Sequence, residues 1–139
     1  MVRVQRGQLS LEYLLLLLAV FAVFSFLVPL LTKVYNVALF GLDSANAKQF
    51  TQSIASAVDE MRFLSDGSAK SIVAKPFTSW VVSSNGKGFT VTVKSEPLAA
   101  EKQFVVALPN KLDLQELSFQ GSMLFLVKKS GGTVLIEYN

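Results

Sequence analysis

Apolar residues fill one continuous stretch near the start of the chain. From Tyr13 to Thr32 there is no charged side chain, and residues 14–31 are almost wholly Leu, Val, Ala and Phe. As an α-helix, a run of about 20 residues spans about 30 Å, which is the thickness of the hydrocarbon layer of a bilayer. The pattern therefore predicts a helix that can cross a membrane.

The residues on either side of this run predict its orientation in the membrane and whether it is kept in the mature protein. Arg3 and Arg6 precede it, and Lys33 follows it. The excess of positive charge before the run places the N-terminus in the cytoplasm and the rest of the chain outside. A secretory signal has a shorter apolar region and a small-residue cleavage site after it, and neither is present. We therefore expect the apolar helix to remain in the mature protein.

An amphipathic pattern follows the apolar run. The helical signal weakens at Gly41, where a new cap at Asp43 or Ser44 is one interpretation. Ser65-Asp66-Gly67 is a helix stop, so one long or once-bent helix is expected from about Leu9 to Leu64. Apolar residues at helical spacing predict a buried stripe, made of Phe50, Ile54, Ala57, Met61 and Leu64.

Short β-rich runs separated by turn residues make up the remainder. The predicted strands are Ser71–Ala74, Ser79–Ser83, Phe89–Lys94, Gln103–Leu108, Leu112–Phe119, Ser122–Lys128 and Thr133–Tyr138. We expect an α+β fold, in which the second half of the helix packs on a small, mostly antiparallel β-rich domain.

Two hairpins are the clearest β features. Asn85-Gly86 and Ser130-Gly131-Gly132 lie between strand runs, as turns that need positive φ require. In the third run, Phe89, Val91 and Val93 alternate with Thr90, Thr92 and Lys94, which predicts one buried face and one face in water. The stripe around Ile54 is the expected cover for the buried face.

Composition removes most catalytic chemistry. The chain has 139 residues and neither cysteine nor histidine, which excludes disulfides, imidazole bases and ordinary zinc sites. Removing residues 1–7 takes away Arg3 and Arg6 and leaves 11 basic against 10 acidic side chains, so nucleic-acid binding by bulk charge is not expected. We expect no enzyme, no cofactor and no metal. No Asn-x-Ser/Thr sequence occurs, so N-glycosylation is not expected either.

Other candidate groups have simpler interpretations. Asp59 and Glu60 are adjacent, so on a helix they point about 100° apart and are solvated charges rather than a catalytic pair. Asp113 and Glu116 have no evident partners. Lys128-Lys129 is interpreted as a solvated hairpin end, with contact to an anionic surface as the alternative. Four phenylalanines are interpreted as packing residues rather than a cofactor site: Phe21, Phe24, Phe26 and Phe40.

One motif directly precedes the apolar run. Arg6-Gly7-Gln8-Leu9-Ser10-Leu11-Glu12-Tyr13 resembles the class III signal peptide of archaeal type IV pilins, with a basic residue and Gly before the cleaved bond and Gln-x-Ser-x-Glu after it. The resemblance covers about residues 3–32. It implies removal of residues 1–7 by a class III prepilin peptidase, an aspartic membrane protease, which leaves Gln8 as the new N-terminus.

The resemblance also implies a role for each residue of the motif. Glu12 would pair with the ammonium freed at Gln8 of a neighbouring subunit and set the register of assembly; the alternative is a carboxylate at headgroup level, favoured by the helix dipole. Ser10 is either a helix N-cap or part of peptidase recognition. Gly7 leaves the peptide accessible to the protease, or is only a helix breaker. Pro29 marks either local loss of helix or a plain kink.

The function implied is that of a structural filament subunit. Residues 1–7 would be the removed signal peptide, 8–64 the helix with a hydrophobic half (13–32) and an amphipathic half (33–64), and 65–139 the extracellular head. The precursor would sit in the membrane, and an assembly ATPase and a platform membrane protein would build an extracellular homopolymer, with surface adhesion as its expected role. The filament core would be formed by the helix at Tyr13, Leu14, Leu17, Phe21, Phe24, Leu27, Pro29 and Leu31.

Two other functions stay open. The chain could be a minor pilin or pseudopilin, or a single-span anchored protein that does not polymerise and binds something outside the cell. The sequence of the mature N-terminus separates the second from a pilin.

Overall fold

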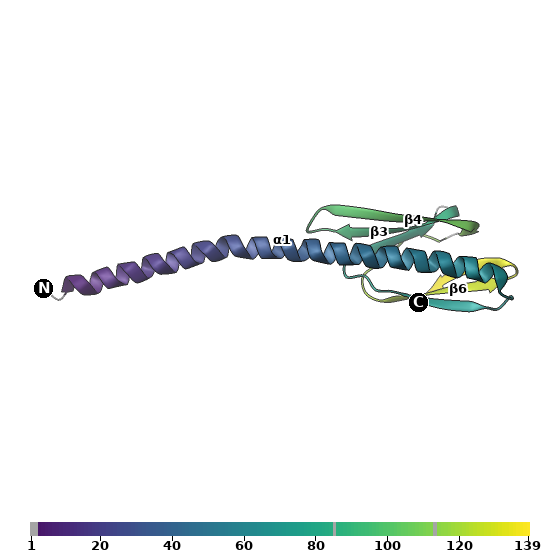
Figure 1. Cartoon of the computed structure of the whole chain (residues 1–139), viewed down its shortest axis with the longest axis horizontal. Coiled ribbons are helices and arrows are strands. Elements are labelled where there is room, and N and C mark those ends of the chain that lie inside the picture. Colours follow the sequence, from purple (N-terminus) through teal and green to yellow (C-terminus); the bar gives the residue numbers. More distant parts are fainter. Residues whose placement is uncertain (1–2, 85, 113) are drawn as a thin grey trace. The chain divides into compact units, whose positions relative to one another are not determined.

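A single long helix and a set of short strands make up the chain. The computed structural model describes residues 3–84, 86–112 and 114–139, and side chains at 10–84, 88–108 and 114–139. Helix α1 covers Arg3–Phe63 (Figure 1). The chain divides into two units, Met1–Asn36 and Val37–Asn139, and we call the second unit the head.

The end of α1 is fixed by contacts that are distant in sequence. The helix ends at Phe63, and Gly67 takes a φ of 92°, so the predicted stop is confirmed. Lys129 Nζ donates to the carbonyl oxygens of Arg62 at 3.2 Å and Leu64 at 2.6 Å. These carbonyls have no partner within the helix, and a cation there also opposes the negative end of the helix dipole. The interpretation of Lys129 as a solvated hairpin end was therefore wrong.

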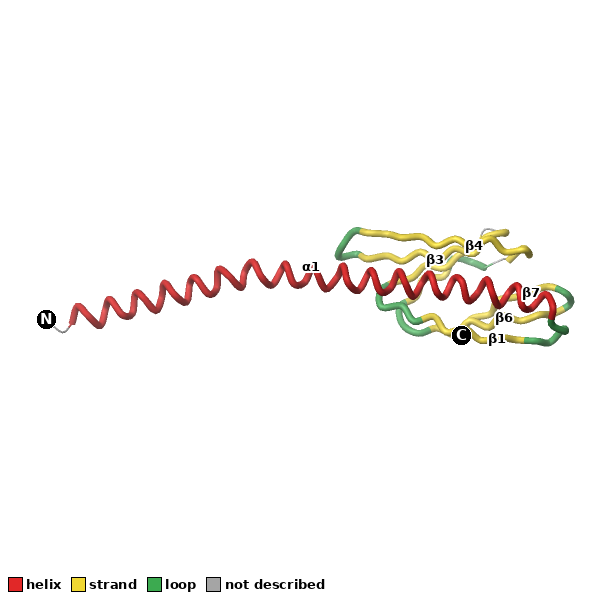
Figure 2. Tube along the Cα trace, in the orientation of Figure 1, coloured by secondary structure: helices red, strands yellow, loops and turns green. Residues whose placement is uncertain are grey.

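Seven strands follow among the described residues. They are β1 (Ala69–Ala74), β2 (Ser79–Ser84), β3 (Gly86–Ser95), β4 (Ala100–Leu112), β5 (Leu117–Phe119), β6 (Met123–Ser130) and β7 (Thr133–Tyr138). They form a three-stranded sheet in the order β1-β6-β7 and a four-stranded sheet in the order β4-β3-β2-β5, with antiparallel pairing throughout (Figure 2). The α+β fold is as predicted.

The fifth strand is shorter than its sequence pattern suggested. Leu112 belongs to the end of β4, and β5 begins only at Leu117. Between them Leu114 is 5% exposed, and its carbonyl oxygen accepts a hydrogen bond from the Ser84 backbone N–H. Apolar residues in this stretch therefore belong to an irregular connection. The spacing of apolar residues in the sequence does not by itself distinguish such a connection from a strand.

Both predicted hairpins are present. β2 pairs with β3 and β6 pairs with β7, each antiparallel. Gly131 and Gly132 take φ values of 58° and 77°, which glycine adopts without steric cost. Asn85 lies outside the described residues.

The alternation along β3 is confirmed on its apolar side and corrected on its polar side. Phe89, Val91 and Val93 are fully buried, as expected. Thr92 was placed in water but is only 7% exposed. It lies opposite Gln103 of β4 and Val81 of β2, and strands on both sides leave little room for water around a short side chain.

The helix covers the buried faces of the strands with the predicted stripe. Phe50, Ile54, Ala57 and Met61 are at most 4% exposed, whereas Leu64 is 39% exposed because it follows the last helical residue. Buried residues come from α1 and from strands of both sheets, so they form one core. The structure adds Ala47 and Val58 to the stripe.

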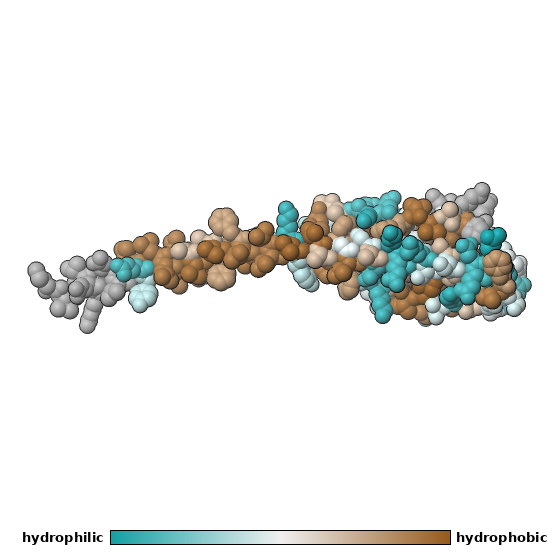
Figure 3. All heavy atoms as spheres, viewed as in Figure 1, coloured by the Kyte–Doolittle hydropathy of each residue, from teal (hydrophilic) through white to brown (hydrophobic). Residues whose placement is uncertain are grey.

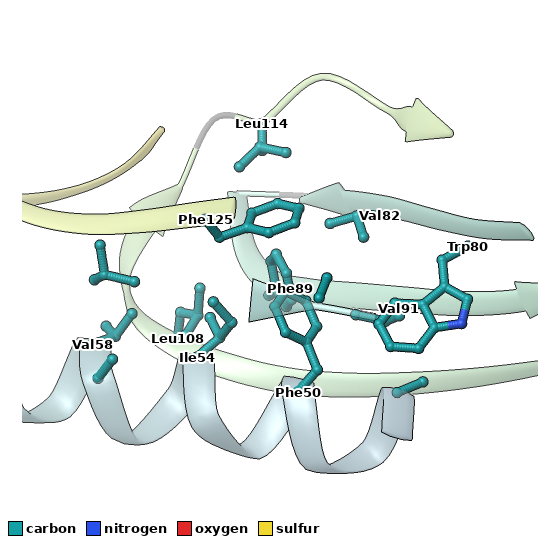
Figure 4. Packing of buried hydrophobic residues seen from close by; sticks show 14 of the residues in the cluster. Phe50, Ile54, Val58, Trp80, Val82, Phe89, Val91, Leu108, Leu114 and Phe125 are labelled. Carbon is teal, nitrogen blue, oxygen red and sulfur yellow. The ribbon is translucent and has the colours of Figure 1, made fainter. Parts of the chain in front are cut away.

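An aromatic cluster joins the three layers. Phe50 of α1 lies 5.8 Å from Trp80, 6.1 Å from Phe89 and 5.1 Å from Phe125, between ring centroids. Phe119 of β5 lies 5.8 Å from Phe125 of β6, so the two sheets meet through these rings. Figure 4 shows Phe50 pointing from the helix toward this group. Edge-on and tilted contacts of this kind add to the stabilisation from buried area.

Asp43 has a different role from the predicted cap. The helix runs through it without interruption, and its side chain is fully buried. Its carboxylate accepts hydrogen bonds from the backbone N–H groups of Phe77 at 3.0 Å and Thr78 at 2.9 Å, and from the Thr78 hydroxyl. Asp43 therefore fixes the loop between β1 and β2 to the helix, and the prediction of a new cap at Asp43 or Ser44 was wrong.

Candidate processing and assembly segment

Among the described residues the first unit is helical, and its side chains from 10 to 35 are all exposed. The helix is apolar and long enough to cross a membrane, and its most hydrophobic window has no buried share. Large apolar side chains from Leu11 to Leu31 are between 42% and 80% exposed. Figure 3 shows this stretch as an almost continuous hydrophobic surface. A helix that is apolar on every face requires a cover from outside its own chain.

The residues of the predicted cleavage motif lie in the first turns of α1. The backbone of Arg6, Gly7 and Gln8 is helical, because α1 begins at Arg3 rather than near Leu9. The helix-breaker interpretation of Gly7 was therefore wrong. The side chains of residues 1–9 lie outside the described part of the chain. A glycine in the first turns still lowers the cost of unwinding the helix there, by about 1 kcal/mol relative to Ala.

Ser10 and Glu12 are both exposed on this helix. Ser10 follows seven helical residues, so the interpretation as an N-cap was wrong for the full chain. Within the described part of the chain, the Glu12 carboxylate takes part in no hydrogen bond or salt bridge. Gln8 and Glu12 are four residues apart, so they lie on the same face of the helix.

Aromatic residues lie at both ends of the apolar run. Tyr13 is 73% exposed and Tyr35 is 63% exposed. Their separation of 22 residues corresponds to about 33 Å along a helix, close to the thickness of the hydrocarbon layer. Tyrosine is enriched where hydrocarbon meets headgroups. Tyr35 was not among the predicted site residues, although its spacing from Tyr13 is visible in the sequence.

Pro29 does not interrupt α1. The helix continues through it, so local loss of helix is excluded. Proline has no N–H to donate to the Ser25 carbonyl, which leaves one backbone acceptor unused. Ser25 Oγ donates to the Phe21 carbonyl at 2.8 Å, and Thr32 Oγ1 donates to the Val28 carbonyl at 2.9 Å. Hydroxyls bonded to the preceding turn need no other partner in a dry environment.

The four phenylalanines that were predicted to be packing residues fall into two groups. Phe21, Phe24 and Phe26 are 55–80% exposed, whereas Phe40 packs against the head core. The packing interpretation is therefore confirmed for Phe40 only. The predicted core positions Tyr13, Leu14, Leu17, Phe21, Phe24, Leu27 and Leu31 all lie on this uncovered helix.

Charged groups of the head are mostly structural or solvated. Glu60 forms a salt bridge with Lys70 of β1, and both side chains are about half exposed. Asp59 is exposed. Asp113 lies outside the described residues. Within the described ranges there is no group of three acidic, histidine or cysteine side chains that could hold a metal ion.

Comparison of the chain with protein-family models, curated proteins and solved structures gives no match. The motif, the uncovered helix and the head are therefore the features that bear on function.

Proposed function

We propose that this protein is the structural subunit of an archaeal type IV pilus-like filament, processed before Gln8 and polymerised through its N-terminal helix. The observation that carries the proposal is an apolar helix that no described part of the chain covers, directly after the sequence Arg6-Gly7-Gln8-Leu9-Ser10-Leu11-Glu12. Both features are needed, because an apolar helix alone is shared by every single-span protein.

Exposing the uncovered helix to water is so costly that it has to pass directly from lipid to the filament core. Each buried Leu, Val or Phe contributes about 1.5–3 kcal/mol, so exposing the whole run to water costs on the order of tens of kcal/mol. Lipid covers the helix in the precursor, and the helices of other copies cover it in the filament. Because helices in lipid gain no hydrophobic energy by associating, extraction has to be driven, which is the role of the assembly ATPase and the platform protein.

Processing defines the N-terminal chemistry of assembly. Cleavage after Gly7 removes Arg3 and Arg6 and creates an ammonium at Gln8. In the proposed filament this ammonium pairs with Glu12 of a neighbouring copy. Among the described side chains Glu12 has no partner, which supports this role, since a carboxylate at the rim of an apolar span requires compensation.

The first test is the N-terminal sequence of the protein from native membranes and from sheared filaments. We expect Gln8 as the first residue in both fractions. A chain that keeps residues 1–7 in its host refutes the proposal and supports the anchored binding protein instead.

The second test is Glu12→Ala, with Lys33→Ala as the control, because Lys33 is an exposed charge at the other end of the apolar run and lies outside the motif. Removing one member of a buried pair costs about 3–5 kcal/mol, so we expect Glu12→Ala to abolish filaments while the head unfolds as in the wild type. Filaments in wild-type amounts would remove Glu12 from the mechanism.

A further inference from the structure

The three-stranded sheet of the head has an uncovered apolar outer face. Along β1, β6 and β7 the residues alternate, so Ile72, Phe125 and Val134 face the core. The residues between them point away from it. Four of these are aliphatic and form what we call the outer patch: Val73, Leu124, Leu126 and Leu135.

The members of the outer patch adjoin one another across the strands. Val73 lies directly opposite Leu124, and Leu126 lies diagonally from Leu135, which is opposite Lys128. Val73, Leu124 and Leu135 are 48%, 41% and 47% exposed. Figure 3 shows hydrophobic surface along the lower edge of the head, the side that holds β6 in Figure 1. A contiguous apolar patch of this kind marks a contact surface.

The four-stranded sheet presents a different outer face. Ser83, Thr90, Lys94, Glu101 and Gln103 line a hollow on this side. Val105 of β4 is 63% exposed and lies on the same face of the strand as Gln103 and Glu101, two and four residues away. Lys94, Glu101 and Gln103 are exposed to solvent, so this face has less need than the outer patch of a second surface to cover it.

The position and charge of the outer patch favour a second copy as its cover. The strands of this sheet run alongside the second half of α1, so the patch is a side wall of the head (Figures 1 and 2). In a polymer of many copies, the heads of neighbours come into contact through walls of this kind. Lys128 and Glu137 also point outward from this sheet, and no salt bridge engages either one among the described side chains. A face with one charge of each sign suits a protein surface better than an anionic lipid surface.

We propose that the outer patch is the lateral contact through which the head of one copy packs on its neighbour in the filament, while the polar face of the four-stranded sheet points to solvent. This inference rests on the proposed function. In a helical polymer the contact is heterologous, so the patch meets a different surface of the next copy.

The absence of cysteine from the chain allows a direct test with single reporters. Leu135→Cys and the control Val105→Cys are labelled with a maleimide in sheared filaments, in detergent-solubilised subunits and in native membranes containing unassembled precursor. We expect Leu135→Cys to lose its labelling in filaments only, and Val105→Cys to be labelled in all three. Val73→Cys is the second reporter if Leu135→Cys does not assemble.

Other outcomes refute the proposal in distinguishable ways. Labelling of Leu135→Cys in filaments at the rate of free subunits refutes the contact but leaves the filament function intact. Protection already in unassembled precursor identifies lipid as the cover and also refutes it. Absence of filaments from wild-type cells refutes the proposed function itself.

A charge test gives a second readout. We expect Leu124→Glu to abolish filaments and Val105→Glu to leave them unchanged, with normal Trp80 fluorescence in both variants as proof of a folded head. Normal filaments from Leu124→Glu would overturn the proposal.

Discussion

Asp43 offers the sharpest test of how the head is held together. Its buried carboxylate is the acceptor for two backbone N–H groups, at Phe77 and Thr78, and for the Thr78 hydroxyl. Asp43→Ala leaves all three donors without this partner. The loop between β1 and β2 then loses its connection to the helix.

The expected magnitude follows from these contacts. Leaving a buried donor unsatisfied costs about 1–3 kcal/mol. Phe77 is 60% exposed and Thr78 is half-buried, so water can replace part of the lost hydrogen bonds, and removing a buried charge recovers part of its desolvation energy. We therefore expect Asp43→Ala to lower the free energy of unfolding by about 3 kcal/mol, roughly a hundredfold in the folding equilibrium. Asp43→Asn keeps one oxygen acceptor and should lose about half as much.

The assay uses a reporter that the chain already contains. Trp80 is the only tryptophan and is fully buried, so its emission shifts to longer wavelength when the head unfolds. We would titrate the full chain with denaturant in a mild detergent and compare it with Asp59→Ala, which removes an exposed carboxylate from the same helix. The control should stay within about 0.5 kcal/mol of the wild type. An Asp43→Ala variant as stable as this control would refute the reasoning.

Three further predictions use the same unfolding measurement. Lys129→Met should destabilise the head by about 1 kcal/mol because it removes the donor at the end of α1, whereas Lys128→Met should have no such effect; equal losses would contradict the capping role. Gly41→Ala should stabilise the head by about 0.5–1 kcal/mol, since an added Cβ meets no atom within 4 Å; destabilisation would show strain at this position. Phe50→Ala should cost about 3–5 kcal/mol because the ring contacts three other aromatic residues, and a loss below 1 kcal/mol would mean that the cluster does not support the core.

If the proposed function holds, the two units have separate tasks. The helix supplies a surface that is never left in water, first in lipid and then among other copies. The head forms the outer surface of the filament and makes the contacts between neighbouring heads. Variants of the head surface should therefore change contacts between heads without affecting membrane insertion, and variants at Glu12 should change assembly without affecting the head.

Features that depend on neighbouring residues were predictable. The apolar run, the stop at Gly67 and the turn at Gly131 each follow from composition or from the conformational freedom of one residue type. The alternation along β3 and the helical stripe of α1 follow from local periods of two and 3.6 residues. Helix continuity through Gly7 was not predictable in this way, because a single glycine weakens a helix without ending it.

Features that depend on contacts between distant residues were decided only by the tertiary structure. Asp43 was interpreted as a cap because its partner at Phe77 is 34 residues away, and Lys129 was interpreted as solvated because Arg62 is 67 residues away. The division of seven strands into two sheets likewise depends on pairings such as β1 with β6, which no local period encodes. The sequence by itself therefore determined the apolar helix and the alternation of the strands, and it contains the motif on which the proposed processing depends. The tertiary structure decided which polar groups are buried and which apolar face of the head is left uncovered, because both depend on what the fold brings together.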